Sequence, residues 1–203
     1  MPAGDVYGSV DNPESIRGLE KNIRRLNYEV GGGFTKDGKP LFTQTKWAPN
    51  YIGFTKEQMA QLLVPSNRGA IFTHNHPGSS SFSGADISFF ARNHLSEMRI
   101  VSRKFEYTLR DPNGFFKTQE TGQNEAGQRN FKFPFSGGDN IDDTLVGLVK
   151  DNEKQNLIRN AAKETGKPIA DIKLKDYRVG FFHLAMTRFA KKYGLEYTRK
   201  RLD

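Results

Sequence analysis

Two of the four histidines in this chain, His74 and His76, stand two positions apart directly after the apolar run 69–73. In an extended backbone, residues i and i+2 project to the same side, so both imidazoles can bind one metal ion. Asp86 follows a turn rich in glycine and serine, at the start of a predicted helix. Two histidines and one carboxylate leave the fourth tetrahedral position to water, which is typical of catalytic zinc sites. The pattern predicts a mononuclear zinc site made of His74, His76 and Asp86.

Each part of this pattern also has an ordinary structural interpretation. Ser83 can act as the N-cap of a helix, with Asp86 favourably placed near the positive helix end. A single His-x-His pair is common by chance, but a strand, His-x-His-Pro, a glycine turn and a Ser-x-x-Asp helix start together favour a metal site. His94 lies about two turns beyond Asp86 on the same predicted helix, too far to bind the same ion. His183 is expected to be a helix residue without a role in this site.

The chain contains no cysteine. A disulfide framework and a thiolate metal site are therefore excluded, and a transition metal must be held by histidine and carboxylate side chains.

The segment from Thr73 to Asp86 resembles the signature of the JAB/JAMM metallohydrolases, in which a distant Glu precedes His-x-His-Pro, a short loop and Ser-x-x-Asp. The resemblance covers about residues 27–110. Six residues separate His76 from Ser83, one fewer than in the usual family pattern. This shortened form, HNHPGSSSFSGADI, is most similar to the JAMM-like domains in the C-terminal parts of phage minor head proteins.

The resemblance implies zinc-dependent hydrolysis of an amide bond, in a peptide or an isopeptide. The family's glutamate lies on an early strand, and Glu29 fits that position, with Glu20 as the second choice. An edge-strand surface glutamate is the structural alternative for Glu29. By resemblance, Glu29 is the general base that takes the proton of the attacking water, and Ser83 donates a hydrogen bond to the tetrahedral oxyanion.

Periodicity predicts the elements that hold these residues. Apolar residues at helical spacing predict helices at residues 14–26, 56–63 and 85–98, the second with a capping box of Thr55 and Gln58. Extended runs predict strands at residues 27–35, 40–47, 69–73, 99–102 and 105–110, with hairpins between the first pair and the last pair. The glycines at 31–33 either weaken the first strand or mark a bulge where another group approaches the backbone. This order indicates a mixed α/β sandwich with helices against a central sheet, which is also the JAB/JAMM-like (cytidine-deaminase-like) fold that the resemblance implies.

We expect one domain with four parts. Residues 1–26 are an N-terminal helical segment, residues 27–110 the metal-binding core, and residues 111–140 an irregular insertion rich in Gly, Asn and Gln. Residues 141–203 are C-terminal helices of the same domain, predicted at 141–165 and 177–193 and ended by Gly166 and Gly194.

The net charge of +8 favours contact with an acidic partner such as nucleic acid, although solvated basic helix faces explain most of it. No run approaches the length of a membrane span, so we expect no membrane partner and a soluble protein, cytoplasmic or virion-associated, with signal-less export left open. A protein or peptide substrate is expected, and the oligomeric state is left open. The alternatives to a hydrolase are a phage morphogenesis or nucleic-acid-contacting module with a vestigial metal site, and a metal-dependent nuclease or toxin domain.

Overall fold

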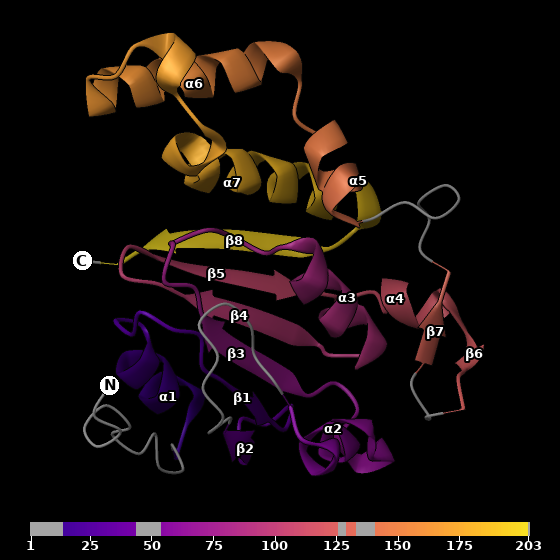
Figure 1. Ribbon diagram of the computed structural model, residues 1–203. Helices are drawn as coiled ribbons and strands as arrows, with labels where there is room; N and C mark the ends of the chain where they lie inside the picture. The colour runs from indigo at the N-terminus through magenta and orange to yellow at the C-terminus, as the bar shows by residue number, and fades with distance from the viewer. Residues whose placement is uncertain (1–13, 44–53, 126–128, 133–140, 203) are drawn as a thin grey trace.

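The computed structural model describes residues 14–43, 54–125, 129–132 and 141–202 (Figure 1). The helices are α1 (Ile16–Ile23), α2 (Lys56–Leu63), α3 (Gly84–Arg92), α4 (Phe115–Thr118), α5 (Ile141–Gly147), α6 (Asp151–Thr165) and α7 (Leu174–Tyr193). The strands are β1 (Gly31–Phe34), β2 (Pro40–Thr43), β3 (Ile71–Asn75), β4 (Glu97–Val101), β5 (Phe105–Arg110), β6 (Glu120–Gln123), β7 (Arg129–Phe131) and β8 (Glu196–Arg201). Short 3-10 helices span Pro65–Asn67 and Ile169–Asp171.

Six strands form one mixed sheet in the order β2-β1-β3-β4-β5-β8. Strands β3 and β4 are parallel, and the other neighbours are antiparallel. The connection from β3 to β4 runs through α3, as a parallel pair requires a crossover. The predicted mixed α/β class is thereby confirmed, with helices against a central sheet.

The sheet has a separate core on each face. On one face α1 packs against β1 and β3, where Leu19, Ile23 and Phe34 are buried. The larger core on the other face joins the sheet to α2, α3, α5 and α7, and Phe72 and Phe189 are among its buried side chains. Figure 1 shows α7 beside β8, with α6 stacked beyond it.

Several local predictions are confirmed. The helix predicted at 56–63 is α2, and its capping box of Thr55 and Gln58 is present. The hairpins β1–β2 and β4–β5 form as predicted. The helices α6 and α7 end at Gly166 and Gly194, whose φ values of 70° and 68° favour glycine.

Other predicted helices and strands have different boundaries in the structure. The first strand begins only at Gly31, and the helix predicted at 85–98 ends at Arg92, since Glu97 already belongs to β4. The region 141–165 forms two helices, because Asp151 and Glu153 favour a new helix N-terminus beside the positive dipole end.

The C-terminal half holds strands that periodicity did not predict. The insertion at 111–140, predicted as irregular, contains α4 and the hairpin β6–β7 among its described residues. Residues 196–201 form β8, which pairs with β5 and completes the central sheet. Residues 1–13 of the predicted N-terminal segment, 44–47 of the second predicted strand, 126–128 and 133–140 of the insertion, and Asp203 lie outside the described residues.

The glycines of β1 allow very close packing on both faces of the sheet. A Cβ on Gly31 would lie 2.6 Å from Phe72 Cζ and 3.0 Å from the Thr73 carbonyl oxygen. A Cβ on Gly32 would lie 2.6 Å from Leu19 Cδ2. The register of β1 against β2 shifts after Gly33. The predicted close approach to the backbone is thus confirmed. The irregularity itself lies in β2, where Leu41 is the extra residue between the partners of Gly33 and Phe34, and the pairing of β1 with β3 is unbroken.

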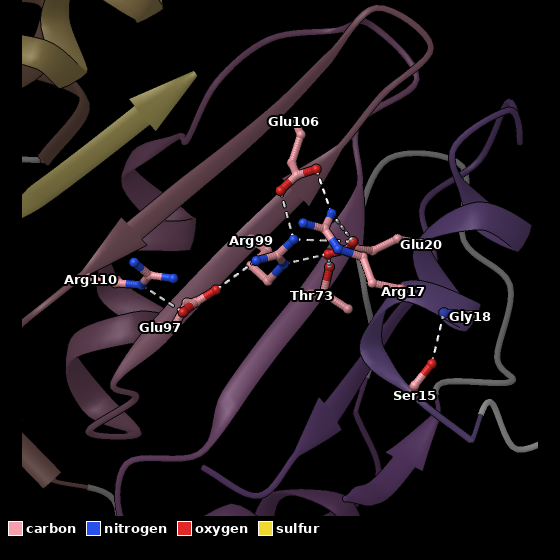
Figure 2. A network of polar contacts seen from close by, with 9 residues as sticks. All are labelled: Ser15, Arg17, Gly18, Glu20, Thr73, Glu97, Arg99, Glu106 and Arg110. Carbon is pink, nitrogen blue, oxygen red and sulfur yellow. Dashed lines mark hydrogen bonds and ion pairs between the residues drawn. The ribbon is translucent and has the colours of Figure 1, made fainter. Parts of the chain in front are cut away.

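A buried arginine joins three strands and a helix on the α1 face (Figure 2). Arg99 of β4 donates hydrogen bonds to Glu20 of α1, Glu97 of β4 and Glu106 of β5. Glu20 also accepts the hydroxyl of Thr73 at 3.1 Å. Burial alone lowers the pKa of Arg99, but its carboxylate partners outweigh this effect and raise the pKa above the usual value. The cation is therefore fully paired, and so are the three buried carboxylates.

We predict that Arg99→Met lowers the free energy of unfolding by about 3–5 kcal/mol, because it leaves buried carboxylates without their cation. Urea unfolding followed by circular dichroism measures this loss. Arg110→Met is the matched control: Arg110 pairs with Glu97 at 2.7 Å, but its side chain is 51% exposed. The control should change stability by no more than about 1 kcal/mol. Equal losses in both variants would contradict the assigned role of Arg99.

Candidate metal centre

Strand β3 brings the two histidines to the face of the sheet opposite α1. Thr73 contacts Glu20 of α1, so its neighbour His74 projects to the other face. His76 follows the strand, and its N–H donates to the Val101 carbonyl at 3.0 Å, which continues the pairing with β4. The Nε2 atoms of His74 and His76 lie 3.0 Å apart, as the predicted spacing requires.

The capping box of α3 fixes Asp86. Ser83 is the N-cap of this helix, and both its backbone N–H and its hydroxyl donate to Asp86 Oδ2, at 2.7 and 2.6 Å. The other oxygen, Oδ1, lies 3.1 Å from His74 Nε2, while Oδ2 lies 3.7 Å from His76 Nε2. The ordinary capping interpretation and the ligand interpretation of Asp86 therefore hold together, since each uses a different oxygen.

The three donors lie close enough together to bind one metal ion. Zinc bonds of about 2.0–2.2 Å place neighbouring ligands about 3.3–3.6 Å apart. His74 Nε2 lies 3.0 Å from His76 Nε2 and 3.1 Å from Asp86 Oδ1, and the three donor atoms all lie within 4.8 Å of one another. Within the described part of the chain, His74, His76 and Asp86 form the one such cluster able to hold a metal ion. Nitrogen and carboxylate donors suit zinc and other divalent transition metals.

The protonation states also suit a ligand role. Burial lowers the pKa of His76 to about 4, so this imidazole is neutral at pH 7. Burial alone raises the pKa of Asp86, but His74, His76 and the Ser83 hydroxyl outweigh this effect and hold the pKa well below its usual range. A neutral imidazole and a carboxylate are the forms that bind metal.

The loop after His76 supplies an outer partner for one of the two histidines. His76 Nδ1 lies 3.0 Å from the Ser80 carbonyl oxygen, the kind of contact that orients a metal-binding imidazole. The Nδ1 of His74 is buried and has no such partner among the described residues. The His74 ring instead packs against Phe72, with 5.5 Å between the ring centroids.

Two tyrosines, one from β5 and one from β8, fix this loop. Tyr107 of β5 donates to the carbonyl oxygen of Ser79, at 2.8 Å, and Ser79 has a φ of 57°. The hydroxyl of Tyr197 on β8 lies 2.9 Å from Ser81 Oγ. Neither tyrosine was predicted to take part in the site, because each lies far from the loop in sequence and carries no metal-binding signal.

A cleft of about 430 Å³ opens beside the candidate metal centre. His76, Ser83 and Asp86 line it, so a metal ion held by the cluster would be accessible from this cleft. Phe54 and Phe89 make part of its wall apolar, with their rings stacked 4.9 Å apart.

Glu29 lines the same cleft, but the expectation that it lies on a strand was wrong. It precedes β1, because the hydrogen bonding of that strand begins at Gly31. Its neighbours Tyr28 and Val30 are buried on the α1 side, and Glu29 itself is half-buried. Burial raises its pKa, Asp86 adds to this rise, and His74 and Arg178 oppose it.

Asn75, between the two histidines, fixes the backbone on both sides of Glu29. Its Oδ1 accepts from Val30 N–H at 2.6 Å, and its Nδ2 donates to the Tyr28 carbonyl at 2.8 Å. The backbone N–H of Asn75 also donates to the Val30 carbonyl, at 3.1 Å. Sequence reasoning missed this residue, because nothing in His-x-His indicates what the middle side chain contacts.

The other candidates lie elsewhere. Glu20, the second choice for the base, lies on the opposite face of the sheet and is paired with Arg99. His94 Nε2 lies 2.9 Å from Glu120 Oε2, and His183 Nδ1 lies 2.9 Å from the Tyr197 hydroxyl. Neither histidine joins the cluster of three ligands, as predicted. The prediction that His94 lies on the same helix as Asp86 was wrong, because α3 ends at Arg92 and His94 follows it with a φ of 46°.

Neither a family model, nor a curated protein, nor a solved structure matches this chain. Among the described helices, none combines the length and the apolar character needed to cross a membrane.

We predict that the purified protein binds about one zinc ion per chain, and that His74→Ala, His76→Ala or Asp86→Ala each lowers zinc content severely. Elemental analysis after dialysis measures this. His94→Ala is the matched control, since His94 lies outside the cluster and contacts Glu120 instead, and it should keep wild-type zinc content. A wild-type zinc content in the first three variants would exclude this site.

We also predict that Asn75→Ala lowers the free energy of unfolding by about 1–3 kcal/mol, because it removes the two buried hydrogen bonds of the Asn75 side chain to the Val30 N–H and the Tyr28 carbonyl. Thermal and urea unfolding of the zinc-free protein measure the loss. Asn113→Ala removes a hydrogen bond to the Gly194 carbonyl from an exposed asparagine and serves as control. If both variants are equally stable, Asn75 does not hold the segment around Glu29.

Proposed function

We propose that this protein is a zinc-dependent metallohydrolase of the JAMM type that cleaves an amide bond, in a peptide or an isopeptide. The observation that carries the proposal is a cluster of three donors at ligand spacing, two of which, His76 and Asp86, line one cleft together with the half-buried carboxylate of Glu29. The three donors would hold the metal ion. Glu29 is not one of them and would transfer the proton.

His74, His76 and Asp86 would hold the zinc ion. When bound, zinc lowers the pKa of a coordinated water toward about 7 and polarises the substrate carbonyl. The open side of the ligand set faces the cleft, so both water and substrate can reach it.

Glu29 supplies the general base in this proposal. As a carboxylate it accepts one proton from the attacking water, and as the acid so formed it returns that proton to the leaving nitrogen. Its partial burial supports this role, because a raised pKa makes the protonated form a better match for a proton shuttle near neutral pH. Asn75 supports the position of Glu29 through its hydrogen bonds to the flanking backbone.

Ser83 remains our candidate for stabilising the tetrahedral oxyanion. It lines the cleft, but its hydroxyl donates to Asp86 Oδ2. The oxyanion role therefore requires the hydroxyl to turn from Asp86 toward the substrate, while the Ser83 backbone N–H keeps Asp86 in place.

We predict that Glu29→Gln retains zinc and folded stability but lowers the rate of amide hydrolysis by about two to four orders of magnitude. Glutamine keeps the size of the side chain but cannot take a proton at neutral pH. The rate is measured with a peptide identified in an unbiased cleavage screen. The acidic limb of the wild-type kcat/KM profile should lie above pH 4.5, the ordinary pKa of a glutamate, and should vanish in the variant.

Glu57→Gln is the control, because Glu57 lies on α2 outside the cleft, and it should leave the rate unchanged. Full activity in Glu29→Gln would assign the base to another group. Loss of zinc in this variant would make Glu29 a ligand or its support. Chelator-sensitive cleavage of DNA, with no amide cleavage, would favour the nuclease alternative.

A further inference from the structure

Helix α7 contributes a charged side chain to the cleft. This residue is not part of the metal-site motif. Arg178 lines the cleft together with Glu29 and His76, although it lies in the C-terminal segment, far from both in sequence. Its positive charge lowers the pKa values of both Glu29 and His76, in line with its position near them. The cleft is therefore built jointly by the metal-binding core and by the last long helix.

Arg178 forms no ion pair with an acidic side chain in the part of the chain that the structure describes, although Glu29 lies near enough to interact with its charge. Its guanidinium lies 5.7 Å from the ring centroid of Phe182, and no hydrogen bond or ion pair involves it among the described residues. This differs from Arg99, which is paired with three carboxylates. An exposed arginine that stacks on an aromatic ring presents its fork of N–H donors to a ligand.

The helix that carries Arg178 is held firmly beside the cleft. Phe181 and Ala185 lie about one and two turns after Arg178 on α7, and both are buried in the larger core. His183 of the same helix contacts the Tyr197 hydroxyl, which in turn contacts Ser81 in the loop after His76. The position of Arg178 is therefore linked to the metal-site loop by packing and by a chain of hydrogen bonds.

The remaining charges in the cleft favour a small anionic group over a polyanion. Arg178 is the one Lys or Arg among the described residues that line the cleft, and Glu29 and Asp86 line it as well. A nucleic acid strand binds through several cations and would be repelled by these carboxylates. A single carboxylate matches the bidentate geometry of one guanidinium. The apolar wall of Phe54 and Phe89 adds a place for an apolar side chain.

We propose that Arg178 binds a substrate carboxylate next to the scissile amide, so that the substrates are acidic peptides or peptides with a free C-terminus cleaved near that end. This inference rests on the proposed amide hydrolysis. The carboxylate can belong to the C-terminus or to an Asp or Glu side chain, and the chemistry that Arg178 recognises is the same.

The experiment is a titration of the zinc-loaded protein with two matched pairs of acetylated peptides. One pair differs only in a C-terminal carboxylate or carboxamide, and the other only in Asp or Asn beside a phenylalanine. Wild type should bind the carboxylate member of at least one pair about 10- to 100-fold more tightly, the range for a charged hydrogen bond. The pair that shows the preference identifies the source of the carboxylate.

Arg178→Gln should reduce this preference to the part that the metal itself contributes, and Arg178→Lys should retain an intermediate preference. Arg159→Gln, a change on the exposed surface of α6, is the control and should behave like wild type. Zinc content is measured in every variant. An unchanged preference in zinc-loaded Arg178→Gln would overturn the inference.

Failure of the proposed function has a different signature. If the wild type binds no zinc, the metallohydrolase proposal fails, and the same titration on the metal-free protein still decides whether Arg178 selects carboxylates. If an oligonucleotide binds more tightly than the carboxylate peptides, and loses that affinity in Arg178→Gln, the carboxylate assignment is wrong and the ligand is a nucleic acid.

Discussion

The alternation of side chains along β3 is the constraint on which the rest of this structure depends. Thr73 contacts Glu20 on the α1 face, and His74 contacts Asp86 on the other face. A shift of β3 by one residue would exchange the two faces and separate the histidines from Asp86. Pairing with β1 and β4 on both sides fixes this register, and the absence of side chains on the β1 glycines lets β1 approach closely.

Buried carboxylates on the two faces of the sheet have different partners. On the α1 face, Glu20 is buried and paired with Arg99, so its charge is neutralised within the fold. On the other face, Glu29 is half-buried near the three candidate metal ligands and forms no ion pair among the described residues. The same residue type thus forms ion pairs within the fold on one face and forms none on the other, where we propose that it transfers a proton. Environment, and not residue type, separates these roles.

The C-terminal segment belongs to the candidate site as much as to the fold. Strand β8 pairs with β5 and supplies Tyr197, whose hydroxyl contacts the loop between His76 and Ser83. Helix α7 supplies Arg178 to the cleft. A fragment that ended after β5 would keep the three candidate ligands but would lose one support of their loop and the one cleft cation described here.

Local features of this protein could be predicted from its sequence. Hydrophobic periodicity and caps predicted α2 and the hairpins, and His-x-His followed by a capped helix predicted the cluster of His74, His76 and Asp86, because these signals act over a few residues. Three features became visible only in the folded chain: Asn75 holds the segment around Glu29, Glu20 lies on the opposite face of the sheet, and Arg178 lines the cleft. Those contacts join residues far apart in sequence, so their positions depend on strand order and helix packing, which no local pattern specifies.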